Sequence, residues 1–284
     1  MRVIDTHAHF WDVENLEYPW IEKGSLFDRT FSLEDYQRAS REIPIERMIF
    51  VEADTHPNCS LRETCWVERL SAEDRRIQGI VAKVTLTDND NVLADLDATA
   101  AIPLVKGIRH NIQDHPPGFA TQEAFVRGVK EVHQRGLHFE LCLRKHQFAE
   151  TFELVKRCPE VSFVLDHCAK PDIRGGSREP WLTQLREMAG LPNVVCKISG
   201  LVTEADWARW QVEEVLWYAR QAAEAFGPTR LLWGSDWPVN EAAGGFTRWF
   251  RAAETLVAGW PRLDQERFFY RNAERVYRLR PAAA

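Results

Sequence analysis

The chain has 284 residues, 45% of them hydrophobic, and this length and apolar content suffice for a single domain over residues 1–284. Its formal net charge of −6 at pH 7, with no separate block of basic residues, argues against a nucleic-acid partner. Without a signal peptide or a run of about 18 apolar residues, the sequence predicts a cytoplasmic protein with no membrane partner.

Short apolar runs alternate with amphipathic stretches along the whole chain, a pattern typical of repeated β-α units. The apolar runs predict eight buried parallel strands, at residues 2–5, 47–52, 77–84, 105–109, 138–143, 161–167, 194–199 and 231–236. The amphipathic stretches predict helices at residues 61–70, 122–135, 148–157, 181–189, 213–226, 248–257 and 265–277. Elements in this order predict a (β/α)8 barrel, an α/β fold of about 250 residues.

The segment from residue 9 to residue 32 is rich in aromatic side chains and has no clear period. It contains Trp11 and Trp20 and follows the first predicted strand directly. Connections after barrel strands lie on the face that carries active sites. We therefore predict a loop that folds over a pocket rather than a second domain.

Polar residues of metal-ligand type lie at the ends of three predicted strands. His7 and His9 are two residues apart, so their side chains point the same way, while His167 and Asp236 end two later apolar runs. An isolated His-x-His pair is more often a solvated or core pair. Four such groups at strand ends are harder to reconcile with a dry core, because each would carry a desolvation cost. Since the first and last strands of a closed barrel are neighbours, we expect these four residues to form one site that holds a divalent ion, activates a water, or does both.

Further residues near strand ends are candidates for substrate binding: Glu52, Arg109, Gln113, His110, His146, Trp11 and Trp237. Arg109 has a planar fork that suits a hydroxyl or a carboxylate, the alternative being a salt bridge at the barrel rim. Glu52 is placed either to bind a sugar hydroxyl or to pair with Lys83. Packing or surface roles are equally open for the two histidines and Gln113, and most of the 11 tryptophans must belong to the core.

Five segments spread over the chain together resemble the amidohydrolase superfamily, in its branch of sugar lactonases and 2-pyrone-4,6-dicarboxylate lactonases. They are residues 4–11 (IDTHAHFW), 106–110 (KGIRH) with Gln113, 163–167 (FVLDH) with Lys170 and Pro171, 196–200 (CKISG) and 233–238 (WGSDWP). The resemblance implies a distorted (β/α)8 barrel. It also implies a hydrolytic role for Asp236, with His7, His9 and His167 clustered around a lactone carbonyl or a bound ion.

The same resemblance bears on the number of metal ions. Many superfamily members complete a two-metal centre with a lysine after strand four and a histidine after strand five. Here the fourth predicted strand ends in Arg109, and His138 lies at the amino end of the fifth. We therefore expect one divalent ion, zinc by ligand type, held by His7, His9, His167 and Asp236, or no required ion, and no two-metal centre.

The leading hypothesis is hydrolysis of a sugar 1,4- or 1,5-lactone, of the L-fucono- or L-rhamnono-lactone type, to its aldonic acid. Asp236 would activate the water, and the histidines or an ion would polarise the carbonyl. Few arginines converge on the expected pocket, which favours a neutral hydroxylated substrate over a dicarboxylate. The alternatives are a zinc-dependent non-oxidative decarboxylase of the same superfamily, hydrolysis of another cyclic ester, and a non-catalytic binding barrel. The sequence does not indicate an oligomeric state.

Overall fold

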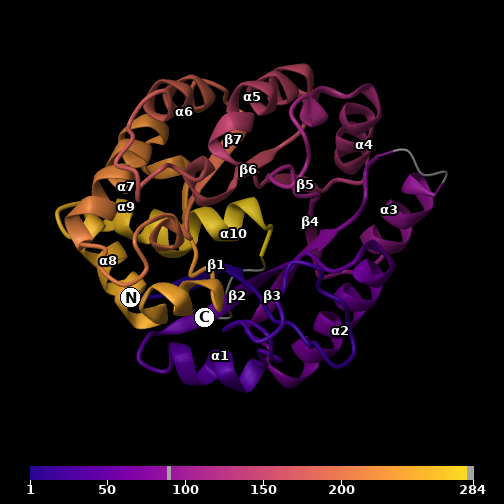
Figure 1. Ribbon diagram of the computed structural model, residues 1–284, viewed down its shortest axis with the longest axis horizontal. Coiled ribbons are helices and arrows are strands. Elements are labelled where there is room, and N and C mark those ends of the chain that lie inside the picture. The colour runs from indigo at the N-terminus through magenta and orange to yellow at the C-terminus, as the bar shows by residue number, and fades with distance from the viewer. Residues whose placement is uncertain (88–90, 280–284) are drawn as a thin grey trace.

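The computed structural model describes residues 1–87 and 91–279, which form a barrel of eight parallel strands surrounded by helices (Figure 1). The strands pair in chain order and are β1 (Val3–Ala8), β2 (Ile45–Val51), β3 (Ile77–Lys83), β4 (Val105–Arg109), β5 (His138–Leu141), β6 (Phe163–Leu165), β7 (Val194–Ile198) and β8 (Leu231–Trp233). Each coincides with a predicted apolar run. The predicted (β/α)8 barrel is confirmed.

The strands depart from their predicted bounds where the chain carries the candidate site. β6 and β8 end at Leu165 and Trp233, before the residues that were expected to close them. His167 and Asp236 instead have left-handed backbones, with φ of 51° and 59°. The chain therefore leaves the extended conformation just before it presents these side chains.

The helices form an outer ring around the barrel, except that the last of them lies across its middle (Figure 1). They are α1 (Leu33–Ser40), α2 (Ser60–Glu73), α3 (Val92–Ala100), α4 (Glu123–Gln134), α5 (Phe148–Arg157), α6 (Trp181–Ala189), α7 (Val212–Phe226), α8 (Gly245–Val257), α9 (Arg262–Glu266) and α10 (Asn272–Val276). The helix predicted over 265–277 is divided into α9, a π-helical turn over Arg267–Arg271 and α10. No prediction was made for α1 or α3. The described helices include none with the length and apolar character needed to cross a bilayer.

The barrel closes between its first and last strands through a short seam rather than a full ladder. A single parallel bridge joins Ala8 to Trp237, just beyond β8. Beside it, the amide of His9 donates to the Trp237 carbonyl at 2.7 Å, and the amide of Asp236 donates to the His7 carbonyl at 2.8 Å. These bonds fix the two candidate site segments against each other.

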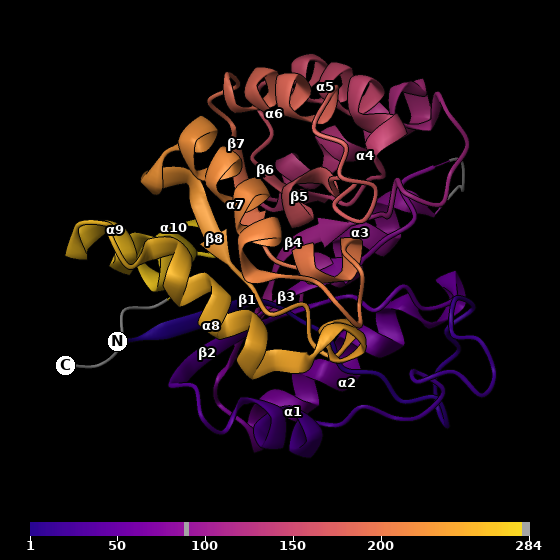
Figure 2. The ribbon, with the colours of Figure 1, turned by 60° about the vertical axis from the view of Figure 1, so that its left-hand side comes forward.

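The C-terminal segment packs against the amino-terminal end of the barrel, opposite the candidate site. Tyr270 and Tyr277 join inner strand residues such as Ile4 and Leu232 in an apolar cluster. Figure 2 shows α8, α9 and α10 grouped beside β8 and β1, and Figure 1 shows α10 crossing the middle of the barrel. With this end covered, the cavity that contains the candidate site lies at the carboxyl-terminal ends of the strands.

Candidate active site

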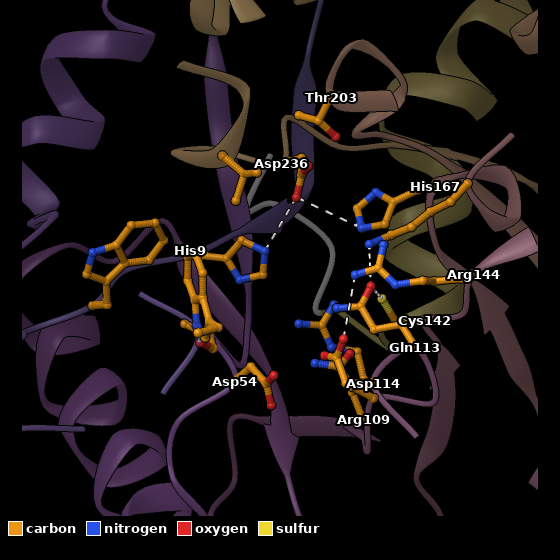
Figure 3. Close-up of a pocket in the computed structure, with 16 residues that line it drawn as sticks. His9, Asp54, Arg109, Gln113, Asp114, Cys142, Arg144, His167, Thr203 and Asp236 are labelled. Carbon is orange, nitrogen blue, oxygen red and sulfur yellow. Dashed lines mark hydrogen bonds and ion pairs between the residues drawn. The ribbon is translucent and has the colours of Figure 1, made fainter. Parts of the chain in front are cut away.

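A cavity of about 360 Å³ lies among the carboxyl-terminal ends of the strands (Figure 3). The residues that line it are His9, Trp11, Trp20, Ala53, Asp54, Arg109, Asn111, Gln113, Asp114, Cys142, Arg144, His167, Lys170, Thr203, Asp236 and Val239. Trp11 and Trp20 come from the segment after β1, which was predicted to fold over the pocket. Their indole nitrogens donate to the Arg29 and Ala53 carbonyls, at 2.8 and 2.7 Å, and thereby hold that segment against the cavity.

One carboxylate oxygen stands at the centre of the four predicted site residues. Oδ1 of Asp236 lies 3.5 Å from Nε2 of His9, 3.7 Å from Nε2 of His7 and 3.9 Å from Nε2 of His167. Figure 3 shows His9 and His167 on either side of Asp236. His7 is fully buried beneath them. The structure therefore brings all four side chains together.

Fixed hydrogen bonds orient two of the imidazole rings. Nδ1 of His9 donates to the backbone carbonyl of Val51 at 2.7 Å, so its Nε2 carries no proton in the neutral ring and faces Asp236 as an acceptor. Nδ1 of His167 forms a hydrogen bond with Oγ of Ser199 at 3.0 Å. Such outer partners set the tautomer and orientation of rings that hold a metal ion or a water.

Burial and neighbouring charges lower the pKa values of the carboxylate and of two of the rings. Burial alone would raise the pKa of Asp236, but the neighbouring His167, followed by the His9 and His7 rings, holds that pKa well below its usual value. Burial lowers the pKa of His167 to about 4. Burial, and then the charge of Lys197, holds the pKa of His7 well below its usual value. At neutral pH the site therefore contains an ionised carboxylate next to the neutral imidazoles of His7 and His167.

A left-handed turn presents His167 and a second cavity residue. Four consecutive residues, His167 to Lys170, have φ between 49° and 59°, and none of them is glycine. Each such residue costs about 1–2 kcal/mol. The amide of Lys170 donates to the His167 carbonyl at 2.9 Å, and the Trp181 indole donates to the Cys168 carbonyl at 2.8 Å. Backbone strain of this kind concentrates at functional sites. Here the strained turn brings the Lys170 ammonium to 2.5 Å from Oε1 of Gln113.

A layer of buried charges supports the site from inside the barrel. Nε of Arg109 lies 2.5 Å from Oε1 of Glu52, and its NH1 lies 3.2 Å from Oδ2 of Asp166. Nζ of Lys197 lies 2.6 Å from Oε2 of Glu140 and 3.1 Å from Oδ1 of Asp166. Arg109 thus lines the cavity while also taking part in buried ion pairs.

Three of the predicted substrate-binding residues line the cavity and four do not. Arg109, Gln113 and Trp11 line it. The other four are Glu52, His110, His146 and Trp237, and each lies elsewhere for a physical reason. Glu52 is fully buried and paired with Arg109 rather than Lys83.

His110 is also buried, and its Nδ1 accepts the amide of Leu86 at 3.1 Å. His146 is exposed on the turn before α5. Trp237 packs edge-on against Tyr36 and Phe31 on the far side of the seam. These three rings therefore belong to packing or to the surface.

Several charged cavity residues were not predicted as site residues. They are Asp54, Asp114, Arg144 and Lys170. Lys170 stands in a segment that carries the family resemblance, which was a usable signal. The other three follow β2, β4 and β5 in turns whose course periodicity does not reveal. Arg144 and Lys170 add to Arg109, so more cations reach the cavity than the sequence suggested.

The donor set fits a divalent ion. One ligand atom from each of His7, His9 and Asp236 lies within 4.8 Å of the others, and the same holds for His7, Asp166 and His167. Neutral imidazole nitrogens beside an ionised carboxylate are ligands of the type that zinc takes. The hydrogen bond that fixes His9 to Val51 is the outer contact expected for such a ligand.

A model of the amidohydrolase family matches residues 4–279. The chain belongs to this amidohydrolase family. It is 32% identical to L-fucono-1,5-lactonase of Burkholderia multivorans, over 90% of this chain and 88% of that protein. Its structure resembles that of an amidohydrolase from Burkholderia multivorans with bound HEPES, with a TM-score of 0.89 and 28% identity over 99% of this chain and all of that chain. A structure of an amidohydrolase from the same organism with bound zinc, also 28% identical over the same shares, gives a TM-score of 0.86.

Proposed function

We propose that this amidohydrolase opens a small lactone by hydrolysis, with a sugar 1,4- or 1,5-lactone of the L-fucono or L-rhamnono type as substrate and the aldonic acid as product. The observation that carries the proposal is the carboxylate of Asp236, ionised and buried among three imidazoles at the end of a cavity. The similarity to an L-fucono-1,5-lactonase over most of both chains supports the choice of a lactone.

Asp236 acts as the general base in this proposal. Its Oδ1 takes a proton from a water that also donates to the unprotonated Nε2 of His9. The oxygen of that water then attacks the lactone carbonyl carbon, and the C=O electron pair moves onto the carbonyl oxygen. A positioned base of this kind contributes about 10²- to 10⁴-fold to the rate.

The negative charge on the carbonyl oxygen needs proton donors. Because Nδ1 of His9 is already bonded to Val51, this ring offers no N–H to the cavity. Lys170 and Arg109 line the cavity and carry permanent N–H donors. When the tetrahedral intermediate collapses, the bond to the ring oxygen breaks, and the proton on Asp236 passes to that oxygen to give the hydroxy acid.

A divalent ion held by His7, His9, His167 and Asp236 would supply Lewis-acid polarisation of the carbonyl and a lowered water pKa. We propose one ion at most. The end of β4 carries Arg109, paired with Glu52, and β5 carries Glu140, bonded to Lys197 at 2.6 Å. Both positions are thus engaged in buried ion pairs within the protein.

A second candidate substrate is a lactone that bears a carboxylate or another anionic group. Arg144 and Lys170 line the same cavity, and Arg144 pairs only loosely with Asp114, at 3.6 Å. Two cationic side chains beside Arg109 favour an anionic substituent on that side of the ring. The reaction would be unchanged.

A pH-indicator assay with a panel of neutral and carboxylated lactones tests the proposal, run with and without a strong chelator and with metal analysis of the purified protein. We expect rapid acid release from one stereochemical series, and loss of about 10²-fold or more in kcat/KM in Asp236→Asn. Asp97→Asn, on the exposed face of α3, is the matched control and retains activity. If no lactone in the panel is hydrolysed and carbon dioxide is released from an aromatic or unsaturated acid, the decarboxylase alternative would be favoured instead.

A further inference from the structure

Asp54 has an unusual backbone for a residue at the mouth of a barrel strand. It follows β2 by three residues and has φ of 55°, in the left-handed region. This conformation is unfavourable for a residue with a Cβ atom and persists where surrounding contacts enforce it. Asp54 also lines the cavity.

Two contacts hold Asp54 in this conformation. Its amide donates to Oε2 of Glu52 at 2.7 Å, and the other oxygen of Glu52 is paired with Arg109. Its side chain is held by Lys83, whose ammonium donates to Oδ1 of Asp54 at 2.5 Å and to the Thr55 carbonyl at 2.6 Å. Backbone and side chain are therefore fixed separately, from β2 and from β3.

The contacts with Glu52 and Lys83 leave one carboxylate oxygen of Asp54 available to a ligand in the cavity. The contacts from the described residues reach Oδ1 of Asp54, and none of them involves Oδ2. The side chain is 26% exposed, whereas that of Lys83 is 10% exposed. Figure 3 shows Asp54 separated from Asp236 across the cavity. A lactone with its carbonyl at Asp236 would direct a different part of its ring toward Asp54.

The charge of Lys83 determines what this oxygen can bind. A carboxylate already neutralised by an adjacent ammonium has little further affinity for a cation, but it remains a strong acceptor for a hydroxyl donor. We propose that Asp54 accepts a hydrogen bond from a hydroxyl on a ring carbon remote from the carbonyl, and so selects hydroxylated over deoxy lactones. Lys83 is its positioning residue. This inference rests on the proposed lactone hydrolysis and identifies a specificity-determining residue within it.

The test compares an aldonolactone with a set of counterparts that each lack one ring hydroxyl. In the wild type, one deoxy lactone should show a kcat/KM lower by about 10- to 100-fold, the range for a hydrogen bond to a charged group. In Asp54→Gly, which suits a left-handed backbone, that ratio should fall to near 1. Asp54→Asn keeps the shape of the side chain and should give an intermediate ratio.

Lys83→Met tests the positioning role. It should reduce the hydroxyl preference severalfold through KM rather than kcat, and Lys83→Arg should restore part of it. Asp95→Asn, an exposed carboxylate of α3 outside the cavity, should leave the ratio at the wild-type value. A uniform loss of activity on all the lactones in the Asp54 variants would overturn the inference.

Binding of the matching lactams, which resist hydrolysis, separates this inference from the proposed reaction. Calorimetry should give weaker binding of one deoxy lactam to the wild type and equal binding of both lactams to Asp54→Gly. Equal affinities in the wild type would overturn the role of Asp54 even if lactones are hydrolysed. An inactive wild type that still discriminates the lactams would instead overturn the hydrolytic function.

Discussion

Oδ1 of Asp236 is the point at which three histidine side chains meet, and its surroundings determine how the site responds to pH. Its pKa is held well below the usual value, so the base stays ionised in moderately acidic solution. The group that limits activity in acid is instead His167, whose pKa burial lowers to about 4. Ionised histidine would add a positive charge beside the base and weaken its attraction for a proton.

The first prediction concerns the pH profile of the wild type. We expect kcat/KM for a lactone to stay level from pH 7 to about pH 5 and to fall with a midpoint near 4, as His167 becomes protonated. The measurement is a pH–rate series in buffers of constant ionic strength. A midpoint near 6.5, the ordinary value for histidine, would mean that these rings are not desolvated as the structure indicates.

The second prediction concerns stability and His110, a buried histidine outside the cavity. Burial, followed by the charge of His115, lowers the pKa of His110 to about 3. The unfolded chain takes up a proton below about pH 6.5 while the folded chain does not, so the free energy of unfolding falls as the pH drops through this window. The limiting slope is about 1.4 kcal/mol per pH unit for this one group.

His110→Asn removes the titration and retains an oxygen that can accept the Leu86 amide. Denaturant unfolding at pH 7 and at pH 5 should show a smaller loss of stability in this variant than in the wild type. His133→Asn, half-buried on α4, provides the matched substitution and should keep the wild-type difference. An equal loss in all three proteins would rule out His110 as a source of the pH dependence.

Among the elements, the turns at the strand ends carry more of the site than the strands themselves. Gly200, two residues after β7, has φ of 59°, and a Cβ atom there would collide with the His167 ring and come within 2.7 Å of Oδ2 of Asp236. The turn after β7 therefore contacts and helps to position His167 and Asp236, which follow β6 and β8. Where the backbone approaches functional side chains this closely, only glycine fits, because it has no Cβ atom.

The third prediction follows from this approach. Gly200→Ala should lower kcat/KM at least 10-fold by displacing His167 and Asp236, beyond the strain of about 1–2 kcal/mol for a left-handed alanine. Gly176→Ala is the control, because Gly176 has φ of 67° and nothing within 4 Å of the added carbon. Both variants should lose stability from the left-handed alanine, and only the first should lose activity. Equal activities of the two variants would show that the turn after β7 accommodates the added Cβ atom without displacing His167 and Asp236.

Whether an element could be predicted depended on the sequence pattern that marks it. Buried parallel strands are continuous apolar runs, so all eight were found, and His7, His9, His167 and Asp236 were found because they end such runs. α1 was missed although Ser32 and Asp35 form a capping box at its start, a signal readable in the sequence. The position of Asp54 at the cavity could not be predicted from the sequence, because it depends on a left-handed residue held by contacts with Glu52 and Lys83.

Across the whole molecule, the barrel interior is divided into an apolar layer, a charged layer and the cavity. The charged layer is Lys197 with Glu140 and Asp166, and the Tyr277 hydroxyl donates to Oε1 of Glu140 at 2.8 Å from the C-terminal segment. Nζ of Lys197 also lies 3.2 Å from Nδ1 of His7. The C-terminal segment, the middle of the barrel and the site are thus connected through fully buried polar groups.

The fourth prediction tests the energetic role of this layer. Lys197→Met should lower the free energy of unfolding by about 3–5 kcal/mol, because it leaves buried carboxylates without their cation. The double variant Lys197→Met with Glu140→Leu should recover part of the loss, since it removes a charge together with its partner. Chemical denaturation provides the measurement. A double variant less stable than the single one would mean that Asp166, not Glu140, depends on the lysine.

The short seam between the first and last strands also has a consequence for biosynthesis. His7 and His9 are translated before the other seven strands, whereas Asp236 follows the last strand of the barrel to leave the ribosome. Because the seam bonds join these two segments directly, a nascent chain that has not yet released β8 holds its histidines without their carboxylate. Hydrolytic competence would then appear late in synthesis and in one step, together with closure of the barrel.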